Sequence, residues 1–148
     1  MVCQLRERRS RPTAHRPALH QPTILCVDDD PDIAAAVEMR LRPFSVNVEC
    51  AFCGMQGIWE AVRQRPDLIL MDLAMPNGDG HYILKCLKEN DETASIPIIV
   101  LTGLRDPQLR RKVLHAGAEQ YLRKPVRSDD LLHNIGRYVD LRPQGHSR

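Results

Sequence analysis

Thr23-Ile-Leu-Cys-Val-Asp-Asp-Asp30 and Asp67-Leu-Ile-Leu-Met-Asp72 are the two stretches that decide the fold. Each is a short aliphatic run that ends in acid. Continuous apolar runs of this length are typical of strands buried on both faces of a parallel sheet. Because ligands bind beyond the carboxyl ends of such strands, Asp28, Asp29 and Asp72 are expected to converge at one edge of the sheet. Three converging carboxylates repel one another, and a hard divalent cation is the partner that would neutralise them.

The rest of the chain alternates apolar runs with amphipathic stretches. Strands are expected over 23–28, 46–51, 67–72, 97–102 and 119–122, and helices over about 31–42, 55–64, 81–90, 107–116 and from 128 onward. Five strands that alternate with five helices predict an α/β fold, a doubly wound five-stranded parallel sheet with helices on both faces.

Residues with capping chemistry stand at several expected helix ends. Asp30 precedes a proline that suits the first helical turn, and Ser128 is placed to cap the last helix. Gly117 follows the fourth helix, where glycine commonly ends a helix. The last helix is expected to turn Tyr138 and Val139 toward the core.

Length and charge together predict one folded domain with a basic arm. The chain has 148 residues and is 43% hydrophobic, which suits a single core. Residues 1–22 contain five Arg and one Glu, whereas residues 23–148 carry a net charge of −2. We expect a disordered basic N-terminal arm over 1–22, the domain over 23–141 and a short C-terminal tail over 142–148. The arm is either simply solvated or a contact for nucleic acid or membrane.

The sequence also bears on the cellular compartment. No apolar run approaches the roughly 18 residues that span a bilayer, and the arginine-rich start lacks the apolar segment of a secretory signal. The five cysteines are odd in number and irregularly spaced, so they do not indicate a disulfide framework. A cytoplasmic location is the resulting expectation.

One pair of cysteines has a spacing that is used by redox and zinc sites. Cys50-Ala-Phe-Cys53 matches C-x-x-C. The second ligand pair that zinc needs is missing, and the motif falls at a strand end instead of opening a helix. We therefore interpret these cysteines as packing and loop residues, and Cys26 and Cys86 as small buried hydrophobic residues.

The polar residues at the ends of the strands have complementary chemistry. Asp28 and Asp29 are suited to hold Mg²⁺, and Asp72 is suited both to ligate it and to attack phosphorus. Lys124 follows the fifth strand and would help to neutralise the charge that builds on phosphoryl oxygens. The Thr102 hydroxyl, at the end of the fourth strand, can donate a hydrogen bond to one of those oxygens.

These residues lie in four motifs that resemble the receiver domain of two-component response regulators, in its single-domain, chemotaxis-regulator-like form. The resemblance covers about residues 23–140, and the motifs occur in the order and spacing of the family. They are Ile24-Leu-Cys-Val-Asp-Asp-Asp-Pro31, Pro66-Asp-Leu-Ile-Leu-Met-Asp-Leu-Ala-Met-Pro76, Pro97-Ile-Ile-Val-Leu-Thr-Gly103 and Ala116-Gly-Ala-Glu-Gln-Tyr-Leu-Arg-Lys-Pro125.

The resemblance implies a flavodoxin-like (βα)₅ fold and a role for each matched residue. Asp72 is implied as the phospho-acceptor, with Asp28 and Asp29 as the metal-binding acid pair. The implied metal is Mg²⁺, with Mn²⁺ as a substitute, and the backbone carbonyl of Ala74 is the expected further ligand. Lys124 is implied as the phosphoryl-binding lysine.

Two further residues and one peptide bond also take implied roles. Thr102 matches the switch hydroxyl of the family, and Tyr121 matches the aromatic residue whose rotamer reports activation. A cis peptide is expected at Lys124–Pro125. Ala74 and Leu104 occupy the two variable positions that flank the site, and neither side chain can hold a water molecule, so a slow loss of the phosphoryl group is expected.

The family also implies partners. The phosphoryl group is expected from a sensor histidine kinase or a histidine phosphotransfer protein. The output is expected to pass to a downstream protein through the face of helix 4, strand 5 and helix 5, where Arg110-Arg-Lys112 lies. A phosphorylation-dependent homodimer is a further option. We expect no DNA-binding domain and no membrane span, and a signalling role instead of metabolic turnover by an enzyme.

Three other classes are weighed against this hypothesis. A degenerate receiver that acts as a constitutive protein-binding module is opposed by the intact set of site residues. A haloacid-dehalogenase-type hydrolase needs a second Asp two residues after the nucleophile, where this chain has Ala74. A nucleic-acid binder led by the basic arm is opposed by the charge of −2 on residues 23–148 and by the lack of a helix-turn-helix segment.

Overall fold

The apolar runs form the five parallel strands of one sheet. In the computed structural model, which describes residues 20–75 and 80–145, the strand order is β2-β1-β3-β4-β5. This order and the parallel pairing confirm the predicted flavodoxin-like fold. The strands are β1 (Thr23–Val27), β2 (Asn47–Ala51), β3 (Leu68–Met71), β4 (Ile98–Thr102) and β5 (Gln120–Arg123).

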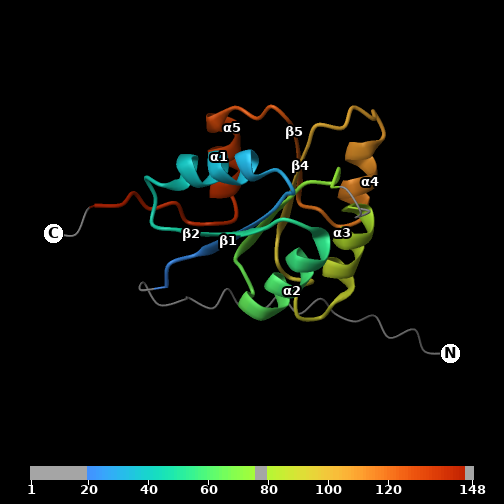
Figure 1. Cartoon of the computed structure of the whole chain (residues 1–148), viewed down its shortest axis with the longest axis horizontal. Coiled ribbons are helices and arrows are strands. Elements are labelled where there is room, and N and C mark those ends of the chain that lie inside the picture. Colours follow the sequence, from blue (N-terminus) through green and yellow to red (C-terminus); the bar gives the residue numbers. More distant parts are fainter. Residues whose placement is uncertain (1–19, 76–79, 146–148) are drawn as a thin grey trace.

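Five helices cover the two faces of the sheet. On one face α1 and α5 lie beside each other, and α2, α3 and α4 lie on the other face (Figure 1). All five expected helices are present, and their ends differ from the predicted ends by a few residues. They are α1 (Pro31–Leu41), α2 (Gly54–Gln64), α3 (Gly80–Glu89), α4 (Leu109–His115) and α5 (Ser128–Gly136).

The core consists of two layers that the sheet separates. Successive residues of a strand point to opposite faces, so Leu25 and Val27 of β1 pack toward α2 and α3, whereas Ile24 and Cys26 pack toward α1 and α5. All four residues of β3 and all five of β4 are buried. Burial on both faces explains why these strands are continuous apolar runs in the sequence.

The helix ends confirm some expectations and correct others. The Asp30 side chain accepts the Asp32 amide at the start of α1, and Gly117 beyond α4 has φ 110°, as predicted. Ser128 is not an N-cap, because it is already the first helical residue, and Arg127 precedes it without a side-chain cap. Tyr138 and Val139 contact the core from beyond the end of α5.

The two ends of the chain lie partly outside the described residues. Residues 1–19 of the predicted basic arm and residues 146–148 of the predicted tail are among those not described, as are residues 76–79. Within the described part, the Pro22 carbonyl accepts the Asn47 amide, and Pro143 forms an antiparallel bridge with Phe44. None of the helices in the described ranges is long and apolar enough to cross a membrane.

The packing of α2 against β1 depends on a glycine. A Cβ at Gly57 would lie 2.8 Å from one Val27 methyl carbon and 2.9 Å from the other, and Val27 is fully buried. Gly57→Ala should therefore lower the free energy of unfolding by about 1–2 kcal/mol, because overpacking outweighs the higher helix propensity of alanine. Chemical denaturation measures the change.

Gly136→Ala is the matched control, because the nearest atom to its new Cβ would be 4.0 Å away. This variant should equal or exceed the wild type in stability. If Gly57→Ala were as stable as Gly136→Ala, the close contact between α2 and β1 would be absent in solution.

Candidate functional site

Parallel pairing brings four chain segments to one edge of the sheet. Asp28 directly follows β1 and Asp72 directly follows β3, and these strands are neighbours in which Val27 pairs with Met71. The Asp72 amide donates to the Val27 carbonyl at 3.0 Å, which fixes the two acids side by side. Thr102 ends β4, and Lys124 follows β5 with its amide bonded to the Thr102 carbonyl at 2.9 Å.

Three carboxylates meet at this edge, as the sequence predicts. One carboxylate oxygen from each of Asp28, Asp29 and Asp72 lies within 4.8 Å of the others. Asp28 and Asp72 are buried, at 3% and 6% exposure, whereas Asp29 is exposed to solvent. The cluster is therefore half enclosed, with one acid at its open side.

Lys124 is the cation of this cluster. Its Nζ lies 2.7 Å from Asp28 Oδ2, where it donates a hydrogen bond, and 3.4 Å from Asp72 Oδ2. The 2.7 Å contact has the length of a charge-assisted hydrogen bond, which is stronger than a neutral one. One ammonium against three carboxylates leaves a formal charge of −2, so the edge remains strongly acidic.

The local environment shifts two titrations. Burial raises the pKa of Asp28, and the charge of Asp72 adds to this, while the hydrogen bonds from Lys124 and from the Asp30 amide oppose it. Burial by itself would lower the pKa of Lys124, but its hydrogen bond to Asp28 and the charges of Asp72 and Asp28 outweigh burial and raise it. Lys124 is therefore charged at neutral pH.

Backbone amides hold the carboxylates in position. Asp28 Oδ1 accepts the Asp30 amide at 3.0 Å, and Asp72 Oδ1 accepts the Ala74 amide at 3.1 Å. In each carboxylate the other oxygen, Oδ2, is the one near Lys124. Hydrogen bonds within the chain thus orient the two side chains, which is favourable for binding and for reaction.

This donor set fits a hard divalent cation. Mg²⁺ prefers oxygen ligands and usually binds through one or two carboxylates, and it keeps several waters. The three acids offer such oxygens close together with an excess negative charge, and the exposed Asp29 leaves one side open to water. Ala74 follows the acid cluster in the chain; the expected role of its carbonyl stays a prediction.

The two residues with implied switch roles lie next to this edge. Thr102 is fully buried, and its Oγ1 accepts the Leu104 amide at 3.2 Å. Tyr121 on β5 is half-buried, and its hydroxyl lies 3.5 Å from the Leu104 carbonyl oxygen. The loop after β4 therefore contacts both residues, and the Lys124–Pro125 peptide is cis, as expected.

One residue that supports the site was not singled out from the sequence. A Cβ at Gly80 would lie 2.5 Å from Leu73 Cα and 2.6 Å from the Leu73 carbonyl oxygen. Glycine therefore lets the start of α3 approach the backbone just after Asp72. This close approach depends on the tertiary packing, so there was no signal for it in the sequence alone.

The C-x-x-C pair has no metal-binding partners in the described part of the chain. The four described cysteines are all free thiols, and Cys50 Sγ lies 3.3 Å from Glu38 Oε1. Burial raises the pKa of Cys26 to about 12, and burial with the Glu38 hydrogen bond raises the pKa of Cys50 to about 11. Cys26 is buried as predicted, whereas Cys86 is only half-buried.

Comparison with known proteins agrees with this arrangement. A family model described as response regulator receiver domain matches residues 24–136. The DNA-binding dual master transcriptional regulator RpaA of Synechocystis is 36% identical over 114 residues, which is 77% of this chain and 47% of that protein. ArlR of Staphylococcus saprophyticus is 32% identical over 121 residues, 82% of this chain and 54% of that protein. The chain spans about half the length of these two relatives.

Solved structures of response-regulator and receiver proteins are also similar to this chain. The chemotaxis protein CheY4 of Vibrio cholerae superposes with a TM-score of 0.75 at 28% identity, over 81% of this chain and all of that chain. The receiver domain of the sensor histidine kinase PA1611 from Pseudomonas aeruginosa has a TM-score of 0.72 at 32% identity, over 80% and 98% of the two chains. That structure contains a magnesium ion coordinated in its active-site cleft.

The environments of the cysteines predict their order of reaction. Cys53 is exposed, whereas Cys26 is buried, and burial raises the pKa of its thiol to about 12, which disfavours the reactive thiolate. Brief treatment of the native chain with iodoacetamide at pH 8 should therefore label Cys53 and leave Cys26 unmodified. Peptide mass spectrometry measures both, and the unfolded chain in urea, where both should react, is the control. Rapid labelling of Cys26 in the native chain would contradict its burial.

Proposed function

The chain belongs to the response-regulator receiver family, and we propose that it is a phosphorylation-dependent switch that accepts a phosphoryl group on Asp72. The observation that carries this proposal is the contact of the Lys124 ammonium with both Asp28 and Asp72, two members of the cluster of three acids. An acid that only forms part of a loop does not require a lysine and two further carboxylates beside it, and a structural ion pair requires only one carboxylate.

Asp72 is the proposed nucleophile because its two carboxylate oxygens have different neighbours. Oδ1 accepts the Ala74 amide, and Oδ2 lies near Lys124. In the transfer, a carboxylate oxygen of Asp72 forms a bond to phosphorus, while the bond from phosphorus to the donor breaks and the leaving group keeps the electron pair. Lys124 would hold the phosphoryl oxygens where negative charge develops, and the positioned carboxylate needs no reorientation.

Asp28 and Asp29, together with Asp72, are the residues that we propose to hold Mg²⁺ or Mn²⁺, with the Ala74 carbonyl as a further ligand. When bound, such an ion neutralises the phosphoryl oxygens and lessens the repulsion that an incoming anion would meet. Asp28 is fixed by the Asp30 amide and by Lys124, so it can present its charge without losing side-chain freedom on binding.

The proposed response to phosphorylation involves the loop after β4. The Thr102 hydroxyl would turn toward the new phosphoryl group and release the Leu104 amide that it now accepts. Because Tyr121 contacts the same loop at the Leu104 carbonyl, a shift of this loop would reach the surface formed by α4, β5 and α5. The change is a population shift between two packings.

The partners follow from this role. We propose a sensor histidine kinase or a histidine phosphotransfer protein as the donor, and a downstream protein or a second copy of the chain as the reader of the face of α4, β5 and α5. That face carries the exposed cations Arg110, Arg111 and Lys112, which would favour an acidic reader. We place these exchanges in the cytoplasm, and the role is signalling instead of metabolic turnover.

Direct phosphorylation tests the proposal. Incubation with acetyl phosphate and Mg²⁺ should add one phosphoryl group to the wild type, as measured by intact mass, and Asp72→Asn should add none. Asp140→Asn is the matched control, because Asp140 is exposed and pairs only with Arg142 among the described residues. Chelation of Mg²⁺ should prevent phosphorylation of the wild type and of Asp140→Asn. A phosphoryl adduct on Asp72→Asn, or none on the wild type, would contradict the assignment and favour a constitutive binding module.

The phosphorylated state should decay slowly for a domain of this family. Hydrolysis needs a water molecule in line with the new bond, and the flanking side chains of Ala74 and Leu104 offer it no hydrogen bond. Ala74 is exposed and lies within reach of Asp72 through its amide, so Ala74→Asn should shorten the lifetime by about threefold to tenfold. Mass spectrometry after removal of the phosphodonor measures the decay.

Ala35→Asn, at an exposed position of α1, makes the same chemical change away from the site and should leave the lifetime unchanged. Loss of the phosphoryl group from the wild type within seconds, or equal lifetimes for Ala74→Asn and Ala35→Asn, would overturn the argument from these two side chains.

A further inference from the structure

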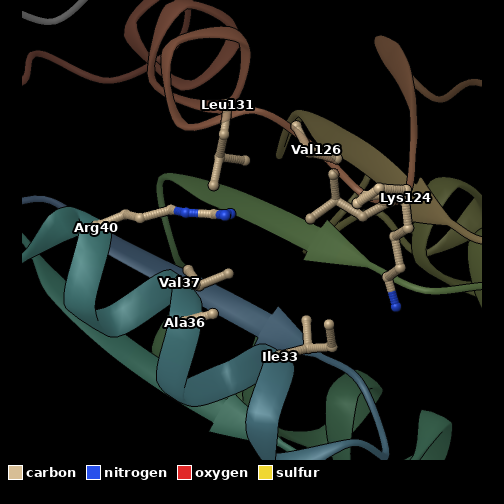
Figure 2. Close-up of a pocket in the computed structure, with 9 residues that line it drawn as sticks. Ile33, Ala36, Val37, Arg40, Lys124, Val126 and Leu131 are labelled. Carbon is tan, nitrogen blue, oxygen red and sulfur yellow. The ribbon is translucent and has the colours of Figure 1, made fainter.

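A pocket of about 310 Å³ opens between α1 and the segment that leads from β5 into α5. This volume lies at the lower end of the range that small-molecule sites occupy. Figure 2 shows side chains from α1 on one side and from the start of α5 on the other. The apolar walls include Ile33, Ala36, Val37, Leu101, Val126 and Leu131.

Arg40 gives this apolar pocket a charged end. Its side chain extends from α1 across the pocket toward Leu131, as Figure 2 shows. Arg40 lies in the last turn of α1, where the helix dipole favours a cation. The dipole accounts for a cation at this position, but it does not account for a guanidinium that lies across an apolar pocket.

The guanidinium has no anionic partner among the residues that the structure describes. Neither a hydrogen bond nor a salt bridge joins Arg40 to residues 20–75 or 80–145, and Glu38, also on α1, accepts from Cys50 instead. Arg40 is only partly exposed. Because a half-buried cation beside apolar walls loses hydration without compensation, an anion bound next to it would be favoured.

We propose that this pocket binds a small carboxylic acid with a short apolar body. The carboxylate would pair with the Arg40 guanidinium, which can donate two parallel hydrogen bonds, and the apolar body would fill the space between Val37, Leu101 and Leu131. A neutral apolar molecule would leave Arg40 unpaired, and a cation would be repelled by it. The pocket is thus selective by charge as well as by shape.

Ligand binding in the pocket would be coupled to phosphorylation at the acidic edge of the sheet, an inference that rests on the proposed function. Lys124 lines the pocket, while its amine points away from Arg40 in Figure 2 and bonds Asp28. Leu101 in the wall directly precedes Thr102. A ligand that contacts these residues in one state of the switch more than in the other changes the equilibrium, and phosphorylation changes ligand affinity by the same factor.

Titration of the full chain with octanoate, followed by amide NMR, tests the site without any phosphodonor. Octanoate should cause saturable shifts at Val37, Leu101 and Leu131, whereas octylamine should cause none at these residues. Arg40→Gln should weaken octanoate binding at least about tenfold, since a charge-assisted pair is lost. Arg42→Gln is the matched control: Arg42 is an exposed arginine at the C-cap of α1 that does not line the pocket.

A second variant separates the shape of the pocket from its charge. Ala36→Leu places extra bulk inside the pocket from a half-buried helical position and should remove octanoate binding while the far-UV circular dichroism is retained. Equal affinity for octanol and octanoate, equal affinity of Arg40→Gln and Arg42→Gln, or shifts confined to another surface would overturn the proposal. Shifts that appear only with an acidic peptide would assign the pocket to a protein partner and would also overturn it.

The coupling has its own measurement. After phosphorylation with acetyl phosphate, the octanoate affinity of the wild type should change at least about threefold. By linkage, bound octanoate should change the equilibrium between the unphosphorylated and the phosphorylated chain by the same factor. Unchanged affinity in a protein shown by mass to be phosphorylated would overturn the coupling. Failure of phosphorylation itself would instead count against Asp72 as acceptor, and the binding result in the unmodified chain would stand independently.

Discussion

The contact of one lysine with two buried carboxylates is the interaction on which the acidic edge of the sheet depends. Lys124 Nζ lies 2.7 Å from Asp28 and 3.4 Å from Asp72, and both acids are nearly inaccessible to solvent. Without this cation two neighbouring negative charges would be buried with no positive partner beside them, which is strongly unfavourable. Because Lys124 is 96 residues from Asp28 in the sequence, the contact also ties β5 to the centre of the sheet.

The same lysine connects two regions with different chemistry. Its ammonium contacts the acids at the edge of the sheet, and the same residue lines the apolar pocket between α1 and α5. A displacement of Lys124 would therefore change the charge balance at Asp28 and the shape of the pocket together. Because Lys124 belongs to both regions, we expect changes at the acid cluster and changes in the pocket between α1 and α5 to influence each other.

Local capping signals in the sequence were right at the start of α1 and wrong at the start of α5, where Ser128 is the first helical residue and not the N-cap. The capping of α1 by Asp30 needs only residues that are adjacent in the chain, and it was predicted. Val139 packs inward as predicted, but it is not part of a helix. The apolar spacing of Leu131 and Ile135 continues to Val139, whereas α5 ends at Gly136. Beyond that point Tyr138 accepts a hydrogen bond from Gln120 on β5, so tertiary contacts hold the segment.

Which residues form the sheet and which polar groups follow its strands could be predicted from the sequence, because buried strands and the acids that end them are runs of consecutive residues. The sequence therefore identified Asp28, Asp29, Asp72 and Lys124 as neighbours. The packing of distant segments sets which oxygen faces Lys124, how far Asp29 stays open to water, and that Arg40 lies across a pocket with no anionic partner in residues 20–75 or 80–145. These features depend on distances between segments that are far apart in the chain, and such distances follow from the packing of the whole sheet and its helices.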